Sequence, residues 1–197
     1  MYLAINTASI YTEWVIFDGY KIIFEESRFS KNNESEILLP SIKHFFSDKN
    51  IKFTDLKGLI VVSGPGSFTG LRVGITIVNA LAYTLDIPIY EINLFDLYNL
   101  KDTCNLAEKV IISSGQSKVF MRDKNKNLNN LDVDLWDISN LKGKFIGELR
   151  EKDVEILKNA ELFLREKLLS FGEALGGADL NKFKKVDLAE PVYLQLQ

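Results

Sequence analysis

The segment of residues 59–85 constrains the fold of this chain more than any other. It begins with the β-branched run of residues 59–62, which is typical of a fully buried strand. The loop that follows predicts a tight turn, because glycine reaches positive φ without strain and proline fixes φ. Its residues are Gly64, Pro65, Gly66, Ser67, Phe68, Thr69 and Gly70. The apolar residues 71–85 then predict a helix that is buried on most sides, with Ser67 or Thr69 as N-cap.

A strand, a glycine-rich loop and a helix start form a general anion-binding arrangement, since free backbone N–H groups and the helix dipole face the loop. A P-loop is excluded, because Leu71-Arg72 follows the last glycine in place of Lys-Ser or Lys-Thr. A dinucleotide-binding loop fits better, with three glycines before the helix and Glu91 at the end of the next predicted strand. Against it, Pro65 removes one N–H from the loop. We interpret the loop as a structural turn and keep nucleotide binding as the alternative.

Composition narrows the class of protein. The chain has 197 residues, 46% hydrophobic and 26% charged, which is typical of a soluble globular protein with one large domain or two small lobes. Its net charge of −3 argues against direct binding of nucleic acid. We find no apolar run near the ~18–20 residues of a membrane span and no basic leader, so we expect no membrane association.

Cysteine and histidine each occur once in the chain, which excludes sites that need several of either residue. One cysteine, Cys104, excludes an internal disulfide and fits a reducing cytoplasm, so we expect a cytoplasmic protein. One histidine, His44, excludes any metal cluster built from several histidines. We interpret Cys104 as a packed or partly exposed thiol and His44 as a half-exposed helical side chain.

The first half of the chain predicts an alternation of strands and helices. Residues 1–5, 13–18 and 21–27 are expected to form three antiparallel strands, with a hairpin at Gly19-Tyr20. A helix follows, with Asn33 and Glu36 as a capping box and a bend at Pro40. After residues 59–85, residues 87–92 predict a strand and residues 96–100 the start of a helix.

The second half predicts fewer elements. Residues 110–113 and 118–122 are expected to be strands joined by a hairpin turn, followed by a polar loop at 123–130. The stretch between Trp136 and Phe145 is expected to be partly β. Residues 151–170 show apolar residues at helical spacing and predict a long helix that ends before Gly176-Gly177.

Three motifs resemble one family. The string GPGSFTGLRVG of residues 64–74 resembles the signature of TsaB (also called YeaZ), bacterial proteins that take part in making N6-threonylcarbamoyladenosine, the modified adenosine beside the anticodon of certain tRNAs. The string ESEILLP of residues 34–40 resembles the family's His-Ser-Glu-x-Leu-Leu-Pro, with Glu34 replacing the histidine. Residues 190–194, EPVYL, match its closing motif, although Gln195 replaces the usual Arg. The resemblance covers the first hundred residues and the last ten.

The resemblance implies an α/β fold of the actin-like (ASKHA, ribonuclease H-like) type, with two lobes that each hold a mixed β-sheet with helices. Residues 1–100 would form the N-terminal lobe with the partner-binding helices, and residues 101–197 a smaller, divergent second lobe. Besides Glu34 and Gln195, the chain departs from the family at two further places. Asn6 stands where Asp is usual, and we interpret it as an Asx-turn residue, since Asn is no anionic magnesium ligand. Ser113-Ser114-Gly115 replaces the family's Asp-Ala-Arg.

The same resemblance implies a non-catalytic scaffold that activates TsaD. TsaD is similar to TsaB but holds a metal through a His-x-x-x-His pair, and the matching positions here are Leu94 and Tyr98. We therefore expect no catalytic residue and no metal in this chain. TsaB pairs with TsaD through helices that correspond to residues 34–48 and 70–85. The candidate partner-binding residues are Glu34, Ile37, Leu38, Ile42, Arg72, Ile75, Val78 and Asn79. The alternative, that they fill the core of the lobe, stays open.

The resemblance also implies partners and cofactors. The chain itself would bind no cofactor, and ATP and a metal would be held by partner subunits. A TsaE-type ATPase would bind the TsaB–TsaD pair, tRNA would be contacted only indirectly, and a homodimer would form when TsaD is absent. An alternative is an actin-like ATPase or kinase that uses Asn6, Thr7 and the glycine loop. It needs an acidic magnesium ligand near Thr7, where Asn6 stands. A Rossmann domain is opposed by the N-terminal hairpin.

Overall fold

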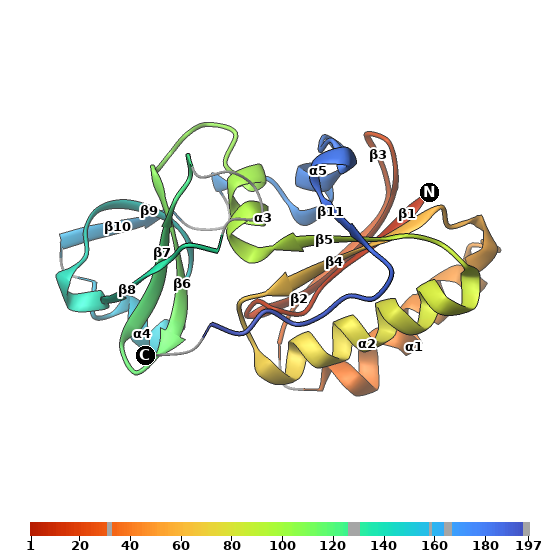
Figure 1. The fold of residues 1–197 in the computed structure, drawn as a ribbon, viewed down its shortest axis with the longest axis horizontal. Coiled ribbons are helices and arrows are strands. Elements are labelled where there is room, and N and C mark those ends of the chain that lie inside the picture. The colour runs from red at the N-terminus through yellow and green to blue at the C-terminus, as the bar shows by residue number, and fades with distance from the viewer. Residues whose placement is uncertain (31–32, 126–130, 158, 164–166, 195–197) are drawn as a thin grey trace.

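The computed structural model describes residues 1–30, 33–125, 131–157, 159–163 and 167–194 as two adjacent β-sheets (Figure 1). The first sheet has the strand order β11-β5-β4-β1-β2-β3. Its strands are β1 (Tyr2–Asn6), β2 (Tyr11–Asp18), β3 (Lys21–Phe29), β4 (Gly58–Gly64), β5 (Ile89–Asn93) and β11 (Lys184–Val186). β4 runs parallel to β1 and β5, whereas β2 runs antiparallel to both β1 and β3. The predicted N-terminal three-stranded unit is confirmed.

The second sheet has the strand order β10-β9-β6-β7-β8. Its strands are β6 (Lys109–Gly115), β7 (Lys118–Asp123), β8 (Asp134–Asp137), β9 (Lys142–Glu148) and β10 (Asn159–Phe163). β6 and β7 form the predicted hairpin, and β9 runs parallel to both β6 and β10. Two mixed sheets with helices therefore confirm the predicted class. The predicted polar loop lies partly outside the described residues, since 126–130 are not among them.

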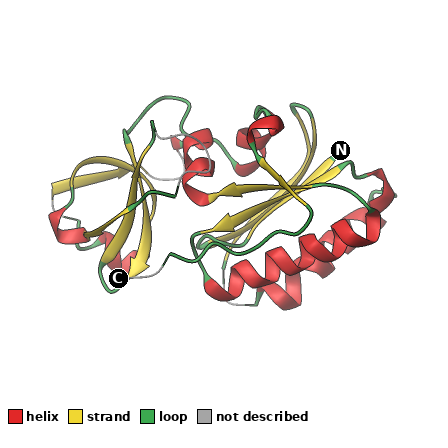
Figure 2. Ribbon diagram, in the orientation of Figure 1, coloured by secondary structure: helices red, strands yellow, loops and turns green. Residues whose placement is uncertain are grey.

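Helices cover both faces of the first sheet (Figure 2). The helices are α1 (Glu34–Asp48), α2 (Phe68–Leu85), α3 (Leu94–Lys101), α4 (Glu151–Val154) and α5 (Phe171–Gly176), with 3-10 turns at Phe53–Asp55, Ile138–Asn140 and Leu180–Lys182. In Figure 1, α1 and α2 lie side by side below the first sheet, and α3 and α5 lie above it. α3 also contacts β6 and β9, so it lies where the two sheets meet.

The N-terminal caps were predicted correctly for one of the two main helices. Ser67 caps α2, because its Oγ accepts a hydrogen bond from the Gly70 N–H at 3.1 Å. The capping box at the start of α1 is wrong, since the Asn33 side chain makes no capping hydrogen bond. The backbone carbonyl of Asn33 accepts from the Glu36 N–H instead, so a simple turn begins this helix.

The helix predicted for residues 151–170 is wrong. Among the described residues of this range, only α4 is α-helical, and Asn159–Phe163 forms the edge strand β10, which pairs in parallel with β9. In short segments, apolar residues at helical spacing do not distinguish a helix from a strand. Here the hydrogen bonds that the segment forms with β9 at the edge of the sheet stabilise it more than its weak helical preference would. Leu162 and Ala160 pack on the second sheet's own apolar cluster, which explains their apolar character.

The prediction that α2 is buried on most sides is also wrong. Of the 18-residue helix, 33% is buried, and Tyr83 on its outer side is 93% exposed. The buried residues are Gly70, Leu71, Gly74, Ile75, Val78 and Ala82. By length and composition this helix is also apolar enough to cross a membrane, contrary to the expectation that no segment approaches that limit. Here it packs along β4, with contacts to β1 and β5.

The C-terminal segment returns to the first sheet, so the second lobe is smaller than the predicted residues 101–197. β11 pairs antiparallel with β5, and α5 packs against β2 and β3. One buried apolar cluster joins the first sheet to the inner face of the second through Val110 and Ile112. Ile111, between them, belongs to a separate cluster on the outer face, as expected for strand residues that alternate between faces.

Candidate functional site

The glycine loop and the C-terminal EPVYL motif lie against each other, although they stand at distant points of the sequence. The Val192 N–H donates to the Ser63 carbonyl at 2.7 Å. Gly64 has a φ of +124°, and a Cβ built there would lie 2.5 Å from the Val192 carbonyl oxygen. Glycine is required at this position both for its backbone conformation and for the close approach of the tail. The two sequence motifs therefore form one structural unit.

The other glycines of the loop let it approach the turn between β1 and β2. A Cβ on Gly66 would lie 1.9 Å from the Ala8 carbonyl oxygen, and one on Gly70 would lie 2.1 Å from that of Thr7. The Ser67 N–H donates to the Ala8 carbonyl at 2.8 Å. Backbone groups that would hold a phosphate in a P-loop are thus used here to bind the chain itself, which supports the structural interpretation of this loop.

Asn6 has the predicted role of an Asx-turn residue. Its Oδ1 accepts from the Ala8 N–H at 3.1 Å, and its Nδ2 donates to Glu13 Oε2 at 2.8 Å. Both carboxylate oxygens of Glu13 lie 3.3 Å from Lys101 Nζ, and all three side chains are buried. Asn6 therefore links the first turn of the chain to α3.

Buried polar side chains connect α3 with the second sheet. Arg122 of β7 forms a buried ion pair with Asp96 of α3, and Lys124 pairs with Asp102 at 2.6 Å. Lone charges are costly in the interior, so each pair fixes how the second sheet sits against α3. Leu94, at the first position that matches the TsaD histidines, is fully buried.

Tyr98, at the second position that matches the TsaD histidines, forms a hydrogen bond with the carboxylate of Glu148. Its hydroxyl donates to Glu148 Oε2 at 2.9 Å, and the Ile10 N–H donates to Glu148 Oε1 at 3.2 Å. Burial raises the pKa of Glu148 to about 7, although these two hydrogen bonds act in the opposite direction. Among the described residues, no group of three or more His, Cys, Asp or Glu side chains could hold a metal ion.

A cavity of about 340 Å³ separates the glycine loop from the β6–β7 turn. Ala8, Gly66 and Ser67 line it from the first sheet. Glu148, Arg150 and the turn at 113–115 line it from the second. The structure thus places the predicted glycine loop close to Ser113-Ser114-Gly115, where the chain departs from the family pattern. Arg150 and Glu148, which no sequence motif had indicated, line the same cavity.

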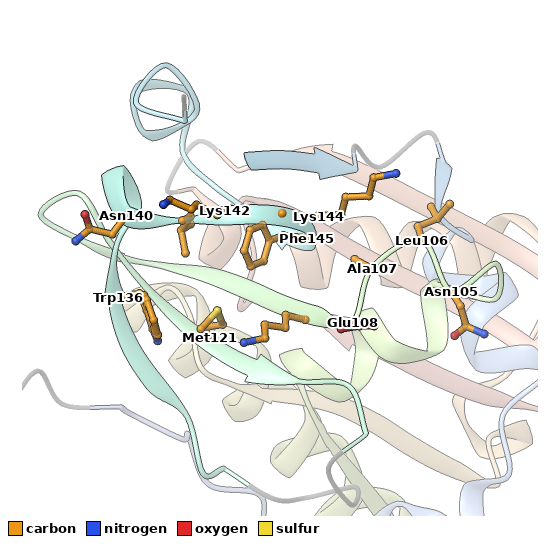
Figure 3. Close-up of a pocket in the computed structure, with 13 residues that line it drawn as sticks. Asn105, Leu106, Ala107, Glu108, Met121, Trp136, Asn140, Lys142, Lys144 and Phe145 are labelled. Atoms are coloured by element: carbon orange, nitrogen blue, oxygen red, sulfur yellow. The ribbon is translucent and has the colours of Figure 1, made fainter. Parts of the chain in front are cut away.

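A second, larger cavity of about 560 Å³ lies on the far side of the second sheet (Figure 3). Met121, Trp136 and Phe145 line it together with Lys142 and Lys144. None of the residues predicted to be functional is among its lining residues.

The predicted partner-binding residues divide between core and surface. Four side chains lie in the main core and cannot contact a partner directly: Leu38, Ile42, Ile75 and Val78. Glu34 is also buried, at the start of α1, where it accepts hydrogen bonds from Ser30 and Thr12. Their assignment to a surface strip is therefore corrected, because these positions face the sheet.

The remaining three predicted residues lie at or near the surface. Ile37 is partly exposed on α1. Asn79 exchanges two hydrogen bonds with the backbone of Ala189, at 3.0 and 2.9 Å, and so ties the tail to α2. The Arg72 guanidinium lies 3.8 Å above the Phe68 ring, and its Nε donates to the Tyr193 hydroxyl at 3.3 Å.

Sequence reasoning missed the outward face of α2. Apolar side chains that are exposed or partly exposed follow one another along it: Val73, Ile77, Ala80, Leu81 and Tyr83. The sequence contained the signal for this face. A helix that packs against a sheet needs apolar residues only on the side that faces the sheet, so the further apolar residues of α2 indicate apolar side chains on its outer side. We name this surface, residues 73–83, the outer face of α2.

Comparison with known proteins places the chain in a family. Residues 28–140 match the model of the family described as "TsaD: tRNA N6-adenosine threonylcarbamoyltransferase". The tRNA threonylcarbamoyladenosine biosynthesis protein TsaB of Bacillus subtilis is 33% identical over 91 residues, which are 46% of this chain and 40% of that protein. TsaB of Buchnera aphidicola subsp. Schizaphis graminum is 29% identical over 117 residues, 59% of this chain and 55% of that protein. The matched parts thus span less than two thirds of these relatives.

Solved structures show the same fold over the whole chain. YeaZ from Pseudomonas aeruginosa has a TM-score of 0.73 at 18% identity, covering 98% of this chain and 99% of that chain. Another solved chain, described as similar to peptidase YeaZ from Pseudomonas aeruginosa, has a TM-score of 0.74 at 17% identity, with coverage of 98% and 99%. At this identity the likeness concerns the fold alone.

Proposed function

We propose that this chain, which belongs to the TsaB (YeaZ) family, is an accessory subunit that binds a TsaD-type protein and activates it to form N6-threonylcarbamoyladenosine in tRNA. The names of the relatives indicate the pathway, and the geometry of this chain indicates how it binds its partner. Under this proposal the complex lies in the cytoplasm, and the partner contacts the tRNA.

The exposed outer face of α2 is the observation that carries the proposal. Tyr83 is 93% exposed and Phe68, at the start of the same helix, is 54% exposed. Ile77 and Leu81 are only partly buried, although both pack against the core. Exposed apolar side chains on one face of a helix mark interaction sites, and the helix offers them at regular spacing. We therefore propose that a helix of the TsaD-type partner packs against this face and against the adjacent α1.

The catalytic steps are assigned to the partner. Leu94 is an aliphatic residue buried in the core, and the Tyr98 hydroxyl donates a hydrogen bond to Glu148. Neither position therefore offers a metal ligand of the imidazole type. Under this proposal ATP and the metal are held by partner subunits, including a TsaE-type ATPase. This chain contributes the surface that holds TsaD in its active conformation.

A homodimer would compete with the heterodimer. An apolar helix face can pack against a second copy of itself around a two-fold axis, and the same residues would then be used in both assemblies. We propose that the isolated chain self-associates through the outer face of α2 and that the TsaD-type protein displaces the second copy.

The test is light scattering on a sizing column, with the chain alone and then mixed with the TsaD-type protein of its own genome. A heterodimer or a larger complex of defined stoichiometry is expected for the wild type. Tyr83→Asp should weaken this complex at least tenfold, because it places a charge in the apolar contact. Tyr20→Asp is the matched control, since Tyr20 is 87% exposed but lies in the β2–β3 hairpin. Separate peaks for the wild-type proteins at micromolar concentration would contradict the proposal.

A further inference from the structure

Two residues that line the cavity between the glycine loop and the β6–β7 turn carry buried donors that have no partner among the described residues. Among the residues that the structure describes, Arg150 Nη2 and Ser114 Oγ are both buried and make no hydrogen bond. Both residues line this cavity of about 340 Å³. Buried polar atoms in folded proteins are nearly always hydrogen-bonded, so two such donors on one cavity indicate a polar occupant.

Arg150 is held in place by a buried carboxylate. Its Nε donates to Asp153 Oδ2 at 2.7 Å, and Ser113 Oγ donates to the same oxygen at 3.0 Å. The Asp153 side chain is 1% exposed, whereas that of Arg150 is 38% exposed. Asp153 thus binds one edge of the guanidinium and leaves the Nη atoms for another partner. A guanidinium presents paired N–H groups that match the oxygens of phosphate and carboxylate.

The opposite wall of the cavity also offers a donor. Ser67 Oγ accepts from the Gly70 N–H, and its own O–H has no acceptor among the described residues. Ser67 belongs to the glycine loop of the first lobe, whereas Arg150 and Ser114 follow or end strands of the second sheet. An occupant that bonds to all three would connect the two lobes.

Among the described residues that line the cavity, Glu148 is the one acidic residue. Its two oxygens already accept from the Ile10 N–H and the Tyr98 hydroxyl. Burial raises its pKa to about 7, so its negative charge is reduced at neutral pH. The repulsion that it exerts on an anion beside Arg150 is therefore smaller than that of a fully ionised carboxylate.

We propose that this cavity binds a small oxyanion of the phosphate type, with Arg150, Ser114 and Ser67 as donors. The bound anion contacts both lobes and stabilises their relative position. The role differs from that of the outer face of α2, which lies on another part of the molecule, so each can fail without the other. No bond is made or broken, and no metal takes part.

The larger cavity in Figure 3 serves as a contrast. Its cationic residues are Lys109, Lys142 and Lys144, and none of its described lining residues has a buried donor without a partner. The Lys109 ammonium pairs with Asp123 at 3.6 Å. Exposed lysines satisfy their charge with water, so we expect no defined anion site there.

The experiment is a titration of the full chain with inorganic phosphate at constant ionic strength, kept with sodium chloride. Thermal unfolding and calorimetry would both be recorded. Phosphate should raise the Tm with a saturable dependence on its concentration. Arg150→Gln should weaken phosphate binding roughly tenfold or more, and Ser114→Ala roughly threefold to tenfold. Lys142→Gln, the control in the other cavity, should leave it unchanged.

Two outcomes would overturn the proposal: no saturable effect on the wild type, or the same effect on Arg150→Gln. If Arg150→Gln does not fold, Arg150→Lys keeps the charge without the paired donors and should still weaken binding. Backbone amide NMR shifts should change at both Ser67 and Ser114, and changes in one lobe only would contradict the bridging role. Titration with AMP distinguishes free phosphate from a nucleotide phosphate, since tighter binding of AMP would assign the site to a nucleotide.

Discussion

Two contact regions join parts of the chain that lie far apart in sequence, and they use different chemistry. In the first, the tail seam, residues 189–193 lie along β4 and α2 through backbone hydrogen bonds and close approaches at glycine. In the second, the interlobe seam, α3 contacts the second sheet through buried ion pairs and the Tyr98–Glu148 hydrogen bond. The tail seam depends on shape and the interlobe seam on charge, so only the latter should respond strongly to pH.

The largest effect is expected at the buried ion pair of the interlobe seam. Arg122→Leu leaves Asp96 buried without its cation and should lower the free energy of unfolding by about 4 kcal/mol. Denaturant unfolding measures this change. The control is Lys109→Leu, which removes an exposed ion pair with Asp123 and should cost no more than about 0.5 kcal/mol. Equal losses from the two variants would show that the buried pair is not what holds the lobes.

The glycine loop that adjoins the tail seam should be destabilised when a methyl group is added. Gly66→Ala places its Cβ 1.9 Å from the Ala8 carbonyl oxygen, where both groups are backbone and neither can move freely. We expect a loss of about 3 kcal/mol in unfolding free energy. Gly177→Ala is the matched control, since its Cβ would meet ordinary contacts at 3.7 Å, and it should change stability by less than about 1 kcal/mol.

The pH dependence distinguishes the two regions most directly. The pKa of Glu148 is about 7 in the folded protein, above its ordinary value of 4.5, so the folded state binds the proton more tightly. Stability from this group is therefore present below about pH 4.5 and is lost as the pH rises through 7. Relative to Glu148→Gln, the wild type should lose about 2.5 kcal/mol between pH 5 and 8. Unfolding of both proteins across this range measures the difference.

If the difference in unfolding free energy between the wild type and Glu148→Gln does not vary with pH, this account of Glu148 is contradicted. Glu13 raises the pKa of the same carboxyl, and Lys101 lowers it, so Lys101→Met should steepen the dependence. The Gly66→Ala loss, in contrast, should be the same at pH 5 and pH 8.

The smallest effect concerns the link between the tail and α2. Asn79→Ala removes two hydrogen bonds to the Ala189 backbone and should lower the free energy of unfolding by roughly 1–2 kcal/mol. Thr84→Ala on the same helix removes one exposed bond to the Ala80 carbonyl and should cost less than about 0.5 kcal/mol. Similar losses in both variants would mean that Asn79 contributes only to the helix itself.

The first lobe could be predicted from the sequence in much more detail than the second. Its strands end at clear turn residues, and Ser67 and Asn6 act locally as N-cap and Asx turn, within three residues of their partners. The second lobe contains the wrong helix at 151–170, where the partner strand β9 decides that 159–163 is a strand. Local signals sufficed where the contacts are local, and failed where the deciding contact lies elsewhere in the chain.

The candidate sites show the same division. The glycine loop was identified from its residues, and the structure explains it through its closeness to Ala8 and Val192. The cavity with Arg150 and Ser114 could not be predicted, because its walls come from five separate segments of the chain. Ile75 and Val78 were assigned to a partner surface because composition does not tell which side of an apolar helix faces the sheet.

The sequence by itself determined the strand–loop–helix unit, the order of elements in the first lobe and the family to which the chain belongs. These follow from short-range preferences of glycine, proline and β-branched residues, which act within a few positions along the chain. Only the tertiary structure decided that the tail joins the first sheet, that one side of α2 stays exposed, and that Arg150 faces the glycine loop's cavity. Each of these depends on contacts between residues far apart in sequence, and burial and charge are defined only once those residues meet.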